Sequence, residues 1–273
     1  MELQRVWTVA YSATGNTKKV VTAAAEAAAE QLAVPLTYID FSTPESRAQT
    51  YTFGPTDLVF AATPTYAGKM PNKLLPDFQT RLQGNGAMAA AVVTFGNRNF
   101  DNSLAELCAT LEEDGFHTLS GGAFVGQHAF ALALASDRPN AEDLAEAREF
   151  GRKTAEKAQK LTELPTPVVV RGDAAAPYYV PKGVDGQPVK FLKAKPQIRE
   201  ELCVGCGVCV DVCPVGSVDP ENVANVPGIC IKCQACVRHC PTGAKYFDDP
   251  AFLDHKAMLE QTYTAPQKNE LFY

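Results

Sequence analysis

Short apolar segments alternate with helical patterns through the first 165 residues. The pattern predicts five strands, at 5–11 (RVWTVAY), 35–40 (PLTYID), 57–63 (DLVFAAT), 87–95 (AMAAAVVTF) and about 117–127. It predicts helices at 17–33, which is rich in alanine, and at about 70–82, 100–114 and 140–163. Apolar strands that alternate with helices imply a parallel sheet covered on both faces, so we expect a doubly wound α/β domain over 1–165.

The regular alternation ends near residue 165. Six prolines and three glycines fall between residues 164 and 197, a composition that disfavours helix and central strand. We therefore predict a proline-rich linker at 166–197 that packs along the surface. A cysteine-rich domain is predicted at 198–249, and the tail 250–273 is predicted to begin with a helix at 250–262.

Composition and charge narrow the partners. The chain has 273 residues, with 25 Lys and Arg against 31 Asp and Glu, giving a net charge of −6. This mild acidity gives no reason to expect nucleic acid or an anionic membrane as a partner. No apolar stretch approaches the roughly 18–20 residues that cross a bilayer, and the first residues lack the pattern of a signal peptide. We therefore expect a cytoplasmic protein, whose cysteines stay reduced.

Eight of the nine cysteines form two runs of the pattern C-x2-C-x2-C-x3-C-P, at 203–214 and 230–241. Four thiolates are what a 4Fe–4S cube requires, one for each iron. A zinc ribbon instead uses two separated C-x2-C pairs, and the odd cysteine count argues against complete disulfide pairing. The glycines at 205 and 207 suit a backbone that turns closely around sulfide and offers N–H donors to it.

This region resembles bacterial-type ferredoxin domains that carry two 4Fe–4S clusters. In such domains the fourth cysteine of each run ligates the other cluster. We therefore assign one cluster to Cys203, Cys206, Cys209 and Cys240, and the other to Cys230, Cys233, Cys236 and Cys213. The ninth cysteine, Cys108, lies in a helical pattern and is predicted to be a buried apolar residue.

A second motif follows the first strand. Gly15 permits a tight turn there, and side-chain donors surround it at Ser12, Thr14, Asn16 and Thr17. With the free N–H groups of the next helix, these neutral donors suit a terminal phosphate held without a metal. The motifs of P-loop and dinucleotide-binding proteins are missing. The alternative is an ordinary Ser/Thr helix cap.

The stretch S-x-T-G-N-T resembles the phosphate loop of flavodoxins, which bind FMN. The loops TPTYAGKMPN (63–72) and TFGNRNFD (94–101) follow the third and fourth strands, where flavodoxin-like proteins hold the flavin ring. The resemblance implies a flavin site lined by Thr63, Pro64, Thr65, Tyr66, Ala67, Gly68, Thr94, Phe95, Gly96, Asn97, Arg98, Phe100 and Asp101.

Three residues of this predicted site, and one that follows the fifth strand, have competing interpretations. Tyr66 and Phe100 are expected as aromatic neighbours of the ring, although either could be a core residue. Arg98 could offset charge on the reduced ring or be a solvated surface arginine. His128, in FVGQHAF after the fifth strand, could act as a proton donor, but a structural histidine is the favoured interpretation.

The whole chain resembles fusions of a flavodoxin-like domain with a two-cluster ferredoxin domain. This implies an electron-transfer protein with FMN and two 4Fe–4S clusters, which exchanges single electrons with a redox protein such as a ferredoxin or an oxidoreductase. Direct reduction by NAD(P)H is disfavoured because no nicotinamide site is evident. The alternatives are an FMN-dependent reductase of a small organic acceptor and a redox sensor, and the latter lacks a signalling module. We expect flavin and clusters to meet within one chain or across a homodimer.

Overall fold

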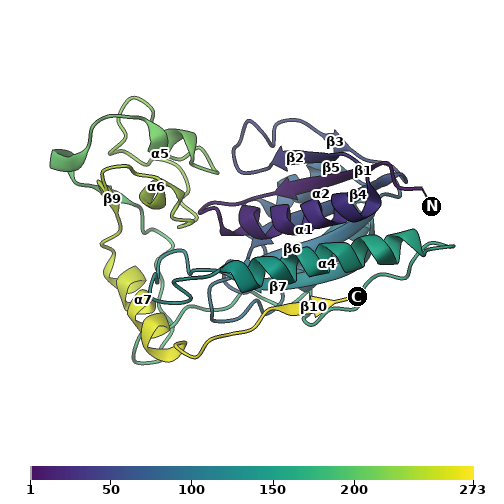
Figure 1. Ribbon diagram of the computed structural model, residues 1–273. Coiled ribbons are helices and arrows are strands. Elements are labelled where there is room, and N and C mark those ends of the chain that lie inside the picture. The colour runs from purple at the N-terminus through teal and green to yellow at the C-terminus, as the bar shows by residue number, and fades with distance from the viewer. Residues whose placement is uncertain (1) are drawn as a thin grey trace.

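The computed structural model describes residues 2–273, and its main sheet contains the five parallel strands that the alternating pattern predicts (Figure 1). They are β1 (Arg5–Ala10), β2 (Leu36–Asp40), β4 (Asp57–Pro64), β6 (Met88–Phe95) and β7 (His117–Val125). Their spatial order is β2-β1-β4-β6-β7. Counted along these five strands, that order is 2-1-3-4-5, the arrangement of flavodoxin-like doubly wound folds. The predicted fold class is confirmed.

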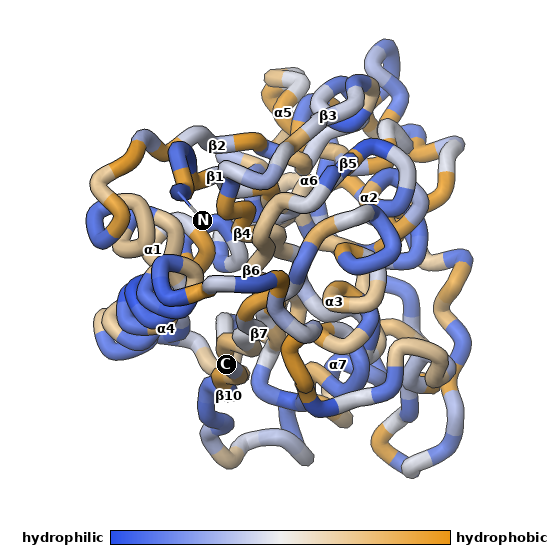
Figure 2. Tube along the Cα trace, turned by 90° about the vertical axis from the view of Figure 1, so that its right-hand side faces the viewer, coloured by the Kyte–Doolittle hydropathy of each residue, from blue (hydrophilic) through white to orange (hydrophobic). Residues whose placement is uncertain are grey.

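Helices cover both faces of this sheet and enclose two apolar cores. Helices α1 (Asn16–Leu32) and α4 (Ala141–Gln159) pack on one face, with Phe150 of α4 fully buried. Helices α2 (Leu75–Arg81) and α3 (Ser103–Glu113) contribute Phe78, Leu104 and Leu107 to the core on the other face. Figure 2 shows that α4 is mainly hydrophilic whereas α1 is mainly apolar. The difference follows from position, because α1 packs against both the sheet and α4.

The C-terminal tail joins the main sheet, which the sequence did not predict. The predicted helix is confirmed as α7 (Pro250–Thr262), and the chain then forms β10 (Glu270–Phe272). Strand β10 pairs antiparallel with β7, with Leu271 opposite Gly122. The tail thus adds a sixth strand at the edge of the sheet. A separate small sheet pairs β3 (Tyr51–Thr52) with β5 (Leu82–Gln83).

The cysteine-rich region lies beyond the carboxyl ends of the parallel strands (Figure 1). Its short elements are β8 (Gln197–Ile198), the 3₁₀ helix η1 (Glu200–Leu202), α5 (Val208–Asp211), α6 (Ala235–Arg238) and β9 (Lys245–Tyr246). The buried guanidinium of Arg47 ties it to the larger part by donating to the carbonyl of Pro214 and pairing with Asp77. Within residues 2–273, no helix combines the length and the apolar character required to cross a bilayer.

Candidate functional site

A cavity of about 610 Å³ opens at the carboxyl edge of the sheet. Strands β1, β4, β6 and β7 end at this edge because they are parallel, so the loops that follow them converge there. The cavity is lined by residues from the phosphate-loop motif and from both predicted ring loops. These lining residues are Thr14, Asn16, Thr17, Pro64, Thr65, Tyr66, Ala67, Gly68, Thr94, Phe95, Gly96 and Arg98.

The first turn of α1 forms one end of the cavity. Gly15 precedes the helix with φ 93°, a left-handed conformation that favours glycine. Asn16 is fixed by donating to the carbonyl of Gln127 at 3.1 Å, and the hydroxyls of Thr17 and Thr94 lie 2.6 Å apart. No protein atom lies within 4 Å of the position that a Cβ on Gly15 would occupy. Helix α1 is 17 residues long, and its N-terminus, the neutral donors and the open space beside them together fit a phosphate group.

Ser12 and Gly15 do not line the cavity. The Ser12 hydroxyl accepts a hydrogen bond from the Lys18 amide at 3.1 Å, so it caps the first turn of α1. The N-cap residue itself is Gly15, which has no side-chain cap, so the ordinary Ser/Thr N-cap that was the alternative for this motif is not formed. Gly15 contributes the turn rather than a wall.

Four residues expected at the ring also lie away from the cavity wall. Thr63 is fully buried within β4, and Asn97 is buried with its amide donating to the carbonyls of Tyr263 and Ala265 in the tail. Phe100 is fully buried against Phe95, so the core interpretation of this residue is the correct one.

The fourth is Asp101, which does not line the cavity. Its carboxylate pairs with the guanidinium of Arg98 and compensates the positive charge of that residue. Arg98 itself lines the cavity, and its guanidinium stacks 4.1 Å from the ring centre of Tyr179. It is therefore a packed and paired residue, not a solvated one.

His128 lines the cavity beside the second ring loop. Its Nδ1 accepts from the Ala131 amide at 3.1 Å, which leaves Nε2 to carry the proton of a neutral imidazole. Burial, followed by the charges of His255 and Arg98, lowers the pKa of His128 to about 3. His128 is therefore a neutral N–H donor at ordinary pH, held by packing against Gly96.

The linker and α7 supply walls that the sequence did not predict. Tyr178, Tyr179, Phe191, His255 and Leu259 all line the cavity. The linker is fixed across the mouth, since the Tyr179 amide donates to the carbonyl of Ala67 at 2.8 Å. The aromatic residues in PYYV were the only sequence signal for these contacts.

A buried lysine fastens the same linker. Lys69 Nζ donates to the carbonyls of Ala174 and Ala176 at 2.8 and 2.9 Å, and it pairs with Glu106 at 2.9 Å. The linker therefore packs down on the α/β domain as predicted.

The cysteines gather around two small cavities in the cysteine-rich region. One is lined by Cys203, Cys206, Cys209 and Cys240, and the other by Cys213, Cys230, Cys233 and Cys236. These are the two sets that the crossed assignment predicts. Gly205 and Gly207 have φ of 67° and 75°, so both adopt the left-handed turns for which glycine is suited.

The two sets of cysteines have different surroundings, and we name them the outer set (Cys203, Cys206, Cys209, Cys240) and the inner set (Cys213, Cys230, Cys233, Cys236). Cys206 is exposed, whereas Cys233 is only 8% exposed and belongs to the core of the α/β domain. Burial raises the pKa of the Cys233 and Cys236 thiols to about 12. At Cys240 burial is outweighed by hydrogen bonds from Lys245, Thr242 and Ala244, which lower the pKa to about 7.

The inner set adjoins the large cavity. Cys230, Ile231 and Lys232 line that cavity together with the predicted flavin loops. Tyr11, fully buried after β1, belongs to the same core cluster as Cys233, and its hydroxyl lies 3.1 Å from that of Tyr66, which lines the cavity. Burial, then Tyr66 and Cys233, raises the pKa of Tyr11 well above its usual value. A chain of contacts thus joins the inner set to the cavity.

The ninth cysteine is separate from both sets. Cys108 is buried in α3, and burial followed by the charge of Glu112 raises the pKa of its thiol to about 12. Cys108 is therefore a buried apolar residue, as predicted.

Both the cysteine-rich region and the α/β domain are similar to known proteins. Models for a 4Fe–4S binding domain match residues 196–219 and 227–243. A solved flavodoxin from the domain Archaea is 16% identical over 57% of this chain and 99% of its own, with a TM-score of 0.41. Two-electron reduced Megasphaera elsdenii flavodoxin is 14% identical over 55% of this chain and 98% of its own, with a TM-score of 0.36. A flavone reductase is 11% identical over 63% of this chain and 67% of its own, with a TM-score of 0.42.

Comparison with curated protein sequences gave no match. The structural similarities are too weak to add to the fold established by strand order. The chain joins a flavodoxin-like α/β domain to two 4Fe–4S binding domains, as the sequence predicted. This combination is that of an iron–sulfur protein with a role in electron transfer.

Proposed function

We propose that the chain is an iron–sulfur flavoprotein in which FMN binds the large cavity and exchanges electrons with two 4Fe–4S clusters. The observation that carries this proposal is that Cys230 lines the same cavity as Thr14, Tyr66 and Gly96. The N-terminus of α1 would hold the phosphate of FMN, and the two ring loops would hold the flavin. The outer and inner sets would each hold one cluster.

The residues lining the cavity suit this ligand electrostatically. Lys73, Arg98 and Lys232 line it, and its described lining residues include no Asp or Glu; Asp101 pairs with Arg98 from outside the cavity, so Lys73 and Lys232 carry the excess positive charge. A phosphate and a reduced flavin are both anionic, so this excess of cations favours them. Bound FMN would supply one- and two-electron exchange, and each cluster would supply exchange of one electron.

The protein residues would bring the two kinds of cofactor together. Tyr66 lines the cavity and contacts Tyr11, which contacts Cys233, so the inner cluster would be the one that exchanges with FMN. His128 would offer its Nε2–H to the ligand, and the linker tyrosines would keep water from one side of the cavity. A donor or acceptor protein would exchange single electrons at the outer cluster.

Two measurements test this proposal. Protein purified without oxygen should contain about one FMN, eight irons and eight sulfides, by the ligand count. Zinc in place of iron and sulfide would contradict the proposal. Rapid mixing of cluster-reduced protein should then show flavin reduction at a rate independent of protein concentration, because both cofactors belong to one chain. A rate proportional to concentration would mean that they meet only by collision.

A second candidate function is reduction of a small organic acceptor at the flavin. It is favoured by the aromatic wall of Tyr179, Phe191 and His255, which encloses the cavity beyond the two ring loops. With 1,4-naphthoquinone as the acceptor, this function predicts a turnover rate that saturates with acceptor concentration. A rate that rises linearly over the whole range would show that no acceptor site is used.

A further inference from the structure

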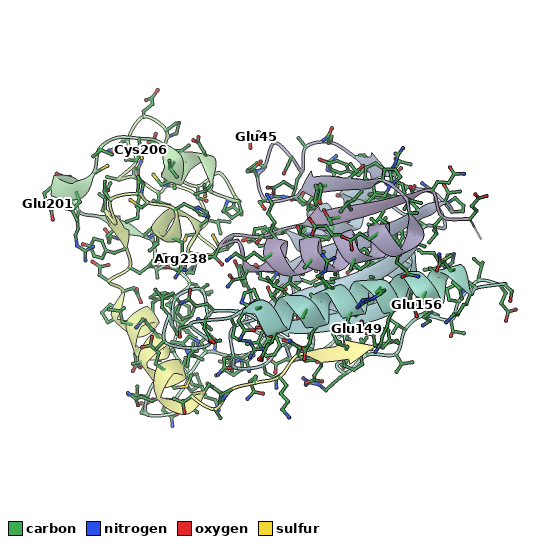
Figure 3. All side chains as sticks on the ribbon, viewed as in Figure 1. Glu45, Glu149, Glu156, Glu201, Cys206 and Arg238 are labelled. Atoms are coloured by element: carbon green, nitrogen blue, oxygen red, sulfur yellow. The ribbon has the colours of Figure 1, made fainter. Side chains whose placement is uncertain are left out.

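The surface around Cys206 differs from the rest of the cysteine-rich region in exposure and in charge. Cys206 is the exposed member of the outer set, and Val204 and Leu202 beside it are 67% and 41% exposed. In Figure 3, Cys206 and Glu201 lie at the end of the molecule that is farthest from α4. An exposed ligand flanked by apolar side chains is a place where a second protein can approach a cluster closely.

The segment that carries this exposed surface is acidic. From residue 200 to residue 231 the chain carries five acidic residues and no Lys or Arg: Glu200, Glu201, Asp211, Asp219 and Glu221. Glu200 and Glu201 lie in η1, directly before the first ligand, and Asp211 ends α5. Asp219 and Glu221 precede Val223, which lines the small cavity formed by the outer set of cysteines.

Two cations, Lys245 and Arg199, accompany these five carboxylates, so the surface keeps a net negative charge. Lys245 is 3% exposed and donates to the carbonyl of Val223, and the guanidinium of Arg199 stacks 4.1 Å from the ring centre of Tyr246. The linker has the opposite charge. Between residues 182 and 197 it carries Lys182, Lys190, Lys193 and Lys195 against Asp185 alone. The acidic segment is therefore distinct in charge from the linker that precedes it.

We propose that this surface, defined by Glu200, Glu201, Leu202, Val204, Cys206 and Asp211, is the docking site for a redox protein whose own redox centre is surrounded by lysines. The inference rests on the proposed function, because it takes the outer cluster as the site of single-electron exchange. Opposite charges would steer the partner to this end, and Val204 and Leu202 would provide the apolar contact at its centre. One electron passes at each encounter, from reduced cluster to oxidised partner or the reverse.

The test uses the anaerobically purified holoprotein with cytochrome c, a basic one-electron acceptor, as the probe. Cluster-reduced protein is mixed with oxidised cytochrome c, and the second-order rate is measured across ionic strength. The wild-type rate should fall as salt is added, because screening weakens steering between opposite charges. The double variant E200K/E201K should react at least about tenfold more slowly at low salt and lose most of this dependence.

The matched control is E149K/E156K on α4, which makes the same change in net charge at a distant surface (Figure 3). At about 0.1 M ionic strength its rate should stay within about twofold of wild type, because the Debye length is then about 10 Å and more distant charges are largely screened. Iron, sulfide and reduction by dithionite, measured on every variant, establish that the clusters are intact. Equal losses in both double variants, no loss in either, or a wild-type rate that rises with salt would overturn the docking site. Wild-type protein without clusters would instead overturn the proposed function, and the docking site with it.

Discussion

The outer set of cysteines and the large cavity are built in opposite ways. Cys203, Cys206 and Cys209 come from seven consecutive residues, and only Cys240 is brought from a distance. The cavity instead needs the loops after four strands, the linker, the segment around Cys230 and α7. The first site is local and exposed, and the second is assembled by long-range packing and partly enclosed. An exposed site suits exchange with a protein, whereas an enclosed one suits a bound organic ligand.

The inner set lies between these two extremes. It has the same local pattern as the outer set, but it packs against the core of the α/β domain and adjoins the cavity. Position, and not ligand type, therefore distinguishes the two proposed clusters. The predictions below test this difference in order of decreasing effect.

The largest effect is expected from removing one ligand of each set. Cys213→Ala should damage the same cluster as Cys230→Ala and abolish flavin reduction by the clusters, because the inner cluster is the one beside the cavity. Cys240→Ala should damage the same cluster as Cys203→Ala and slow exchange with a partner protein. The measurement is electron paramagnetic resonance, since a cube that lacks one thiolate often becomes a three-iron centre. A shared signature for Cys213→Ala and Cys203→Ala would show that the pairing is wrong.

The sequence predicted which cysteines the structure brings together, because residue type and spacing define each run. It also predicted the parallel sheet and α7, whose periodicity is strong. It missed β10, because ELF is too short to predict a strand and is positioned by distant contacts such as that of Asn269 with Val125. The same limit explains Asn97, which was expected at the flavin but binds the tail. Walls formed by the linker depend on how a proline-rich segment folds back, which no local pattern determines.

The next effect concerns the phosphate end of the cavity. Gly15→Val should weaken FMN binding at least about tenfold, because a left-handed residue with a Cβ costs about 1–2 kcal/mol and a branched one more. Fluorescence titration of FMN into flavin-free protein measures this change.

Gly86→Val is the matched control for Gly15→Val. Gly86 has a similar φ of 83°, and it is not among the residues that line the cavity. It should lose stability but keep its FMN affinity. Equal weakening in both variants would mean that strain in the fold, and not the phosphate site, explains the loss.

A smaller effect is expected from His128, whose pKa is held near 3. Between pH 6.5 and 5 the unfolded chain takes up a proton at this residue while the folded protein does not, so stability falls as pH falls. From an unfolded pKa of about 6.5, the loss at pH 5 is about 2 kcal/mol. The thermal midpoint of wild type should therefore drop about 4–8 °C more than that of His128→Gln between pH 7 and 5. Parallel drops, followed by circular dichroism, would show that His128 titrates normally.

The smallest effect tests the contact between the inner set and the cavity. Tyr11 and Cys233 pack in the same buried core cluster, so we expect the Tyr11 hydroxyl to donate to the Cys233 sulfur, and such a bond stabilises the more negative, reduced state of a cluster. Tyr11→Phe removes a bond of about 1 kcal/mol and should lower the midpoint potential of the inner cluster by a few tens of millivolts.

The outer cluster, which Tyr11 does not contact, is the internal control, and the cysteine variants identify which signal belongs to which cluster. Tyr66→Phe should shift the inner cluster less, because the Tyr66 hydroxyl is engaged with the hydroxyl of Tyr11 at 3.1 Å. A redox titration followed by electron paramagnetic resonance separates these outcomes. Equal shifts of both clusters would point to a general change in the fold, and no shift in Tyr11→Phe would show that position alone, without this hydrogen bond, distinguishes the inner cluster from the outer one.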